Sequence, residues 1–161
     1  GGYLEAAIDM ASWFLPMGTN IVTEDFGVKR DKIIYRSKGY DIFSDRLKMV
    51  ILIDGGSASA SEILAGALKE HGIAVLVGQK SFGKGSVQEL ISITPETSLK
   101  VTVARWLTPN GNSISAEGVK PDYAVELDEV KFKKEIDTQV EKAKQVLMDE
   151  AFWQARKLTI E

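Results

Sequence analysis

The first apolar residues of the chain recur at helical spacing. They stand at positions 4, 8, 11 and 15, which is the period of a helix that buries one face. Pro16 and Gly18 follow this stretch, and both residues are typical of the end of a helix. The pattern therefore predicts an amphipathic helix over about residues 4–15.

A strand, a helix and a second strand are predicted for the middle of the chain. Residues 49–53 (MVILI) form a continuous apolar run that stops at Asp54, as in a central strand that is buried on both faces. Residues 74–77 (AVLV) form a second buried run. Between them we expect a helix over residues 59–70 that buries Ile63, Leu64, Ala67 and Leu68. Such a unit predicts an α/β fold with a mixed, layered sheet and flanking helices.

The remaining patterns are shorter, apart from one long helix near the C-terminus. Strand candidates lie at residues 33–35, 87–93, 99–103 and 123–127. Residues 109–111 (PNG) predict a turn, since proline fixes one dihedral angle and glycine permits a positive φ. Apolar residues at 132, 136, 140, 143 and 147 predict a long amphipathic helix.

Composition narrows the classes of function. The chain has 161 residues with 44% hydrophobic and 27% charged side chains, as expected for a globular domain with its own core. Twenty basic and 23 acidic residues give a net charge of −3, so there is no basic surface that would indicate binding to nucleic acid. The absence of cysteine excludes disulfides, thiolate metal sites and a cysteine nucleophile.

The N-terminal sequence is that of a fragment or a processed product. It begins Gly1-Gly2-Tyr3, without methionine. Neither a signal peptide nor an apolar run of membrane-spanning length is present in the sequence. If the chain is such a piece, any targeting segment or further domain upstream of it would not be visible in this sequence.

A cluster of serines follows the first buried strand. Residues 55–62 (GGSASASE) lie where a strand leads into a helix, and α/β proteins tend to place their functional sites at such strand ends. Backbone N–H groups at a helix start can stabilise an oxyanion. The alternative interpretation is structural, because Ser59 and Glu62 have the spacing of a capping box.

A lysine is the candidate base for a serine in this cluster. The one histidine, His71, lies 12 residues after Ser59, or about 18 Å along a helix, so a Ser-His-Asp triad is excluded within this chain. Lysine can replace histidine if it is kept neutral by burial. Lys84, in residues 81–86 (SFGKGS), is the best candidate; an ordinary solvated lysine is the alternative.

Several segments together resemble the C-terminal-processing (tail-specific) serine peptidases. They cover roughly residues 1–127, and their order matches that of the family. The segments are 1–4 (GGYL), 57–63 (SASASEI), 75–78 (VLVG), 82–88 (FGKGSVQ), 102–111 (TVARWLTPNG) and 118–122 (GVKPD). Because several motifs occur in the right order, the resemblance is far more specific than any single match.

The resemblance implies roles for individual residues. Ser59 would be the nucleophile and Lys84, 84 − 59 = 25 residues later, its general base. Gln88 would position the lysine amine. The backbone N–H of Ala60 would supply one oxyanion donor, and a glycine of the Gly1-Gly2 pair would supply the other. No cofactor and no metal are implied.

The same resemblance implies a fold, partners and a location. The fold would be a crotonase/Clp-protease-like protease core, with the C-terminal part of the peptidase core at residues 1–127 and a helical segment at 128–161. The substrates would be proteins or peptides bound by their C-terminal region and cleaved through an acyl-enzyme, outside the cytoplasm. The chain contains no sequence that resembles the family's PDZ domain. The resemblance leaves open whether the protein forms a homo-oligomer.

Two other functions compete with this prediction. Residues 78–84 (GQKSFGK) fit the start of a nucleotide-binding P-loop, but Gly85 stands where a serine or threonine would bind magnesium, and no helix start follows. The second alternative is an inactive protease-like binding module. A serine-reactive probe distinguishes this module from an enzyme.

Overall fold

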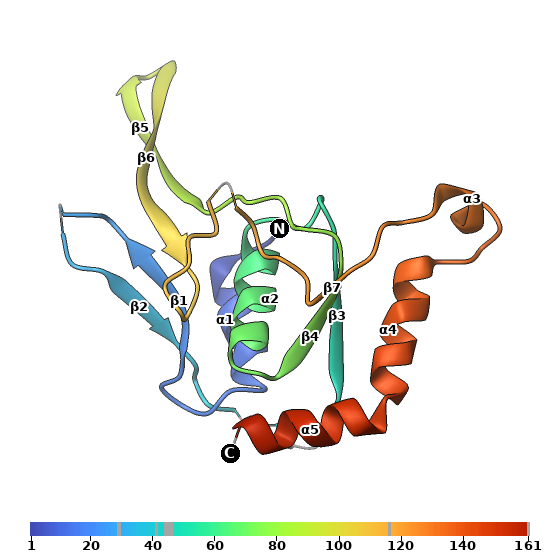
Figure 1. Cartoon of the computed structure of the whole chain (residues 1–161). Helices are drawn as coiled ribbons and strands as arrows, with labels where there is room; N and C mark the ends of the chain where they lie inside the picture. The colour runs from blue at the N-terminus through green and yellow to red at the C-terminus, as the bar shows by residue number, and fades with distance from the viewer. Residues whose placement is uncertain (29, 41, 44–46, 116, 161) are drawn as a thin grey trace.

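The computed structural model describes residues 1–28, 30–40, 42–43, 47–115 and 117–160, with side chains as far as residue 156 in the last helix. Two sheets lie on either side of a pair of helices (Figure 1). In chain order the elements are α1 (Leu4–Ser12), β1 (Asn20–Asp25), β2 (Ile33–Arg36), β3 (Met49–Ile53), α2 (Ala60–Glu70), β4 (Ala74–Gly78), β5 (Ser86–Thr94), β6 (Thr97–Leu107), β7 (Tyr123–Ala124), α3 (Glu129–Phe132), α4 (Thr138–Met148) and α5 (Glu150–Ile160).

The predicted strand–helix–strand unit is present as β3, α2 and β4. The two strands are parallel, and β7 adds a third parallel strand, in the order β3-β4-β7. The prediction that β3 is the central strand was wrong. Every residue of β4 is buried, whereas β3 lies at the edge of this sheet and exposes Leu52. An apolar run indicates that both faces of a strand are buried, but it does not show whether the strand has a neighbour at each edge. In this sheet β4 is the strand with a neighbour at each edge.

The second sheet is antiparallel, with the order β2-β1-β6-β5. The sequence patterns predicted β2, β5 and β6 but not β1, whose Glu24 and Asp25 interrupt an apolar signature even though both are buried. Strands β5 and β6 form a long hairpin that extends away from the rest of the molecule (Figure 1). Strand β5 pairs only with β6, so its other edge is open within the part of the chain that the structure describes.

Helix α2 joins the two sheets, because it contacts both β1 and β4. The predicted apolar residues face one large core together with α1 and β1; Ile63, Ala67 and Leu68 are buried there, and Leu64 packs against it. Ala65 lies on another face of the helix, in contact with the buried cluster of Ile53 and Leu76. Each large apolar side chain that is fully buried contributes about 1.5–3 kcal/mol, so α2 is held firmly from two directions.

The C-terminal segment contains three helices instead of the predicted single long one. Phe132 ends the short helix α3, and Glu135 then adopts a positive φ of 61°. Asp137 caps α4 by accepting hydrogen bonds from the N–H groups of Gln139 and Val140. A cap of this kind starts a new helix, so the apolar period continues across a break in the backbone.

Helices α4 and α5 cover the outer face of the parallel sheet. Val146 and Trp153 are buried against Val75 and Val77 of β4. Arg156 of α5 donates hydrogen bonds to the carbonyl oxygens of Gly72 and Ala74. Among the residues that the structure describes, no helix combines the length and apolar character needed to cross a bilayer.

Candidate active site

Ser59 lies at the tight turn between β3 and α2. Its backbone has φ 59° and ψ −121°, a conformation that costs a residue other than glycine about 1–3 kcal/mol. Asp54 braces the preceding turn, since its Oδ1 accepts hydrogen bonds from the N–H groups of Gly56 and Ser57 at 2.9 and 3.0 Å. Such strain is concentrated at functional sites, and here it falls on the serine that the sequence indicated as nucleophile.

Ser59 and Glu62 form the predicted capping box. Glu62 Oε2 accepts the Ser59 N–H at 2.8 Å, and the Ser59 side chain faces the backbone N–H of Glu62. This second contact lacks the geometry of a good hydrogen bond, so the hydrogen bond from Ser59 to Glu62 is the stronger half of the box. The half-buried Ser59 side chain therefore occupies a capping position in this structure.

Glu62 also connects Ser59 to the loop that holds Lys84. Its side chain is only 1% exposed. Oε1 accepts from the hydroxyl of Ser81 at 2.5 Å and from the N–H of Gly83 at 2.7 Å. Oε2, which accepts from Ser59, also accepts the N–H of Lys84 at 3.0 Å. The backbone nitrogens of Ser59 and Lys84 thus lie no farther apart than 2.8 + 3.0 = 5.8 Å.

The side chain of Lys84 is exposed, which differs from the burial expected for a neutral base. Phe82, two residues before Lys84, is 65% exposed and does not cover it. The backbone N–H groups of Gly83 and Lys84 donate to the buried Glu62, whereas the side chain of Lys84 is exposed. Among the described residues, no carboxylate forms an ion pair with Lys84.

The predicted oxyanion donors lie beside Ser59. Ala60 is the first residue of α2. A Cβ atom placed on Gly1 would lie 4.0 Å from the Cβ of Ser59, and one placed on Gly2 would lie 3.8 Å from the Cβ of Ala60. Figure 1 likewise shows the N-terminus next to the start of α2. The first two residues of the chain therefore form one wall around the serine.

Gln88 is not engaged with Lys84 in this structure. It is exposed on β5 and pairs across the hairpin with Thr102. No hydrogen bond joins the Gln88 side chain to Lys84 within the described part of the chain. Its predicted role in positioning the amine stays a prediction.

The structure also bears on the alternatives. His71 is the C-cap residue of α2 and hydrogen-bonds the carbonyl oxygen of Asn20 at 2.6 Å, so it lies at the far end of the helix from Ser59, as predicted. The residues after Gly85 form strand β5. A P-loop needs a helix N-terminus at that point, so the nucleotide-binding interpretation was wrong.

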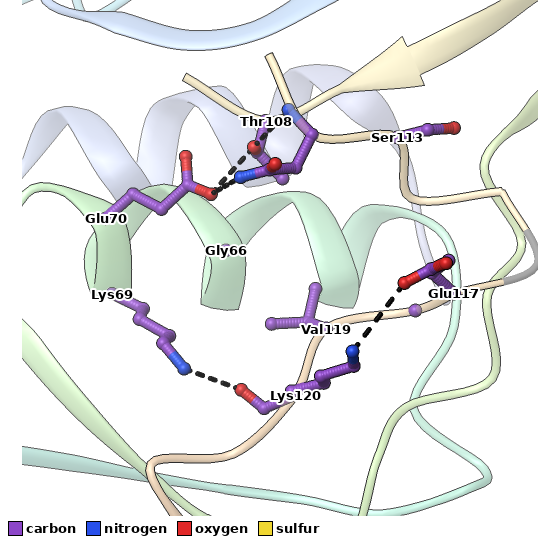
Figure 2. A pocket seen from close by; sticks show the side chains of 10 residues that line it. Gly66, Lys69, Glu70, Thr108, Ser113, Glu117, Val119 and Lys120 are labelled. Carbon is purple, nitrogen blue, oxygen red and sulfur yellow. Dashed lines mark hydrogen bonds and ion pairs between the residues drawn. The ribbon is translucent and has the colours of Figure 1, made fainter. Parts of the chain in front are cut away.

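A pocket of about 310 Å³ lies on α2, away from the serine (Figure 2). Its lining residues are Gly66, Lys69, Glu70, Thr108, Asn112, Ser113, Glu117, Gly118, Val119 and Lys120. Glu70 accepts hydrogen bonds from Thr108 Oγ1 and Asn112 Nδ2, and Lys69 forms an ion pair with Asp122 at 3.1 Å. Glu70 also accepts the N–H of Asn110, so its contacts anchor the turn at residues 109–111. Neither Ser59 nor Lys84 lines the pocket.

Sequence reasoning assigned Glu62 to capping alone and missed Ser81. Ser81 is 3% exposed, and besides donating to Glu62 it accepts the N–H of Val119 at 2.7 Å. The spacing of these residues in the sequence does not predict their contact. The one available signal was the combination of a predicted capping glutamate and a glycine-rich loop next to a predicted catalytic residue.

Comparisons with known proteins place the chain among peptidases. The family described as "Peptidase family S41" matches residues 1–125. A "Carboxy-terminal-processing protease" of Bartonella bacilliformis is 41% identical over 126 residues, which are 78% of this chain and 29% of that protein. A "Carboxyl-terminal-processing protease" of Synechocystis sp. is 39% identical over 132 residues, 82% of this chain and 30% of the other. The chain thus spans under a third of the length of these relatives.

A solved structure shows the same relationship. It is described as "Photosystem II D1 C-terminal processing protease", is 32% identical, and superposes with a TM-score of 0.72 over 94% of this chain and 37% of its own. That coverage is wider than residues 1–125, so the structural similarity includes most of the C-terminal helices.

Proposed function

The chain belongs to peptidase family S41, and on this basis we propose that it is the part of a serine endopeptidase that contains the nucleophile Ser59 and the general base Lys84. One observation supports this pairing most strongly: Glu62 Oε2 accepts hydrogen bonds from the backbone N–H groups of both residues. This contact brings together two residues that are 25 positions apart in the sequence.

The proposed reaction has two halves. Ser59 Oγ attacks the carbonyl carbon of the scissile peptide bond while its proton passes to Lys84 Nζ, and the N–H of Ala60 with one from Gly1 or Gly2 stabilises the oxyanion. Lys84 returns the proton to the departing amine, which leaves an acyl group on Ser59. Lys84 then takes a proton from water, whose oxygen attacks the acyl carbon; when the bond from this carbon to Ser59 Oγ breaks, Lys84 returns the proton to Ser59 Oγ and the new carboxyl group is released.

Because Lys84 is exposed in this structure, the complex with substrate has to shield it from water. A lysine acts as a base only when it is withdrawn from water. A substrate backbone lying over Phe82 and Lys84 would provide that cover, and Gln88 can then hydrogen-bond the amine without adding a charge. We therefore propose that the base is completed when the substrate binds.

Membership of the family supports a proposal for the substrates and for the location. Relatives carry names that describe carboxyl-terminal processing, and we extend this to the present chain as a preference for proteins or peptides bound by their C-terminal region. We also propose an extracytoplasmic location, which fractionation of cells that produce the full-length protein would test.

The experiment compares three serines of one cluster. Ser59→Ala should lower peptide hydrolysis by the full-length protein by at least about 10³-fold, since removal of a nucleophile disables the catalytic group as a unit. Ser57→Ala and Ser61→Ala are the matched controls and should keep substantial activity. A fluorophosphonate probe should label the wild type at Ser59. Hydrolysis at the normal rate by Ser59→Ala would show that the serine or the function is misassigned.

The inactive binding module remains the second candidate, because Lys84 is exposed and unpaired with Gln88. The same probe separates the two functions. A folded full-length protein that binds peptides but is neither labelled nor able to hydrolyse them would support the module.

A further inference from the structure

We propose that Glu62 is a positioning residue for the reaction, whose buried carboxylate keeps the nucleophile and the base in register. This inference rests on the proposed function of Ser59 and Lys84. It assigns a role in catalysis to a residue whose sequence position predicted only a helix cap.

The first argument is the division of the hydrogen bonds. A helix cap requires the contact between Glu62 and the N–H of Ser59 alone. The other three donors, Ser81, Gly83 and Lys84, all belong to the loop that follows β4. Most of the hydrogen-bonding capacity of Glu62 therefore serves this loop and not the helix.

The second argument is that one oxygen serves both catalytic residues. The N–H groups of Ser59 and Lys84 meet at Oε2, at 2.8 and 3.0 Å. A shift of either backbone by more than a few tenths of an ångström breaks one of these two bonds, because hydrogen bonds weaken quickly beyond about 3.2 Å. The oxygen thus fixes the distance between the two chain segments from which the reacting side chains extend.

The third argument is the chemistry of a carboxylate in a buried position. A side chain that is 1% exposed and meets only donors needs a group that accepts on both oxygens, and an ionised carboxylate does this. Glutamine has nearly the same shape, but its amide nitrogen cannot accept a hydrogen bond. It would face either the N–H groups of Ser59 and Lys84 or the Ser81 hydroxyl with the N–H of Gly83, so at least the N–H of Gly83, next to Lys84, or those of Ser59 and Lys84 lose their acceptor.

A second contact limits what the loop can do without Glu62. The N–H of Phe82 donates to the carbonyl oxygen of Ser57 at 2.9 Å, so the loop stays attached to the turn before the nucleophile. Loss of the Glu62 bonds should therefore misplace Lys84 without releasing the whole loop. The expected result is therefore a lower kcat, from the misplaced Lys84, with little change in KM, because the loop stays in place for substrate binding.

The test uses Glu62→Gln in the full-length protein. We expect kcat for peptide hydrolysis to fall by about 100-fold or more while KM changes by less than about threefold, and labelling of Ser59 by a fluorophosphonate to slow in parallel. Glu62→Asp keeps the charge on a shorter side chain that cannot reach both segments, so its kcat should fall at least about tenfold. If Glu62→Gln does not fold, the kcat of Glu62→Asp alone tests the inference.

Trp153→Ala is the control for loss of stability, since Trp153 is buried against β4 and far along the chain from the serine. It should lower the melting temperature but keep kcat near the wild-type value below that temperature. A wild-type kcat in either folded Glu62 variant overturns the inference and leaves the proposed function standing. A wild-type protein that is neither labelled nor active overturns both.

Discussion

Lys84 is held by its backbone while its side chain is exposed. Its N–H donates to the buried carboxylate of Glu62, and among the described residues no carboxylate forms an ion pair with its side chain. Its proposed role is to accept a proton from Ser59. A proton acceptor at this position has to exist in a neutral form, which not every cationic side chain can provide.

This property gives a prediction for Lys84→Arg. A guanidinium is not deprotonated in proteins, so the variant should be as inactive as Lys84→Ala, with kcat lowered by at least about 10³-fold. Peptide hydrolysis by the full-length protein is the measurement. Near-normal turnover by Lys84→Arg would show that positive charge, and not proton transfer, is what the reaction needs from this position.

At the residue scale the sequence pointed to candidate side chains but not to their surroundings. Ser59 and Lys84 stand in motifs that are continuous in the chain, and only the resemblance of these motifs to a known family, not their local pattern, singled them out; their catalytic roles stay predictions. The contact between Glu62 and Gly83 depends on how a helix start and a loop 21 residues later meet in space. No period or spacing encodes that contact, because it is formed by the tertiary fold.

Strand β1 shows how a single carboxylate ties several elements together. Asp25 accepts hydrogen bonds from the N–H of Gly27 and from the guanidinium of Arg105 on β6, and it lies 3.7 Å from the ammonium of Lys32. The backbone hydrogen bond from Gly27, followed by the Arg105 hydrogen bond, lowers the pKa of Asp25 below its ordinary 3.8.

The lowered pKa predicts how Asp25→Asn changes stability with pH. A carboxyl whose pKa is lower in the folded protein stabilises it above the unfolded-state pKa, and this contribution is lost as the pH falls through the folded-state value. Asp25→Asn should therefore melt below the wild type at pH 7, and the difference should shrink as the pH falls below about 4. Melting temperatures between pH 7 and 3 give the comparison.

Asp31, which is exposed in the same region, provides the control. Asp31→Asn should melt close to the wild type across this range. If the gap between Asp25→Asn and the wild type were the same at pH 3 as at pH 7, the ion pair and hydrogen bonds of Asp25 would not be its cause.

At the element scale, sequence patterns identified elements more reliably than their neighbours. Residues 49–53 form the predicted strand, but its place at the sheet edge depends on which strand β7 joins. The apolar period from 132 to 147 was read correctly as helical over α4, yet Asp137 starts that helix anew. Hydrophobic spacing continues across such a break, so it cannot reveal one.

On the scale of the molecule, the C-terminal helices act as a cover for the parallel sheet. Trp153 is buried on Val75 and Val77, and its indole N–H donates to the carbonyl oxygen of Val146 at 2.8 Å. Without this cover, the outer face of β4 would be open to water. Helices α4 and α5 are thus packed on the same sheet that leads into the candidate site, whereas α3 has no buried residue.

Trp153→Ala should consequently cost about 3–5 kcal/mol of unfolding free energy, as expected for emptying a large buried aromatic site. Denaturant unfolding of the chain measures this. Met148, which is 78% exposed on the preceding helix, gives the matched control, and Met148→Ala should change stability by less than about 0.5 kcal/mol. A similarly small change for Trp153→Ala would mean that α5 adds little to the fold.

The open edge of β5 has a consequence for how copies of this chain behave when concentrated. Its last residues, Leu90, Ile91 and Ile93, are exposed, and the strand contains no lysine or proline. Proteins commonly use such residues to keep sheet edges from pairing with one another. Glu89 is the one charged residue of this strand, so the part of the edge beyond it, with Leu90, Ile91 and Ile93, is left as a template for further strands. We therefore expect concentrated copies of this chain to associate first through the end of this hairpin.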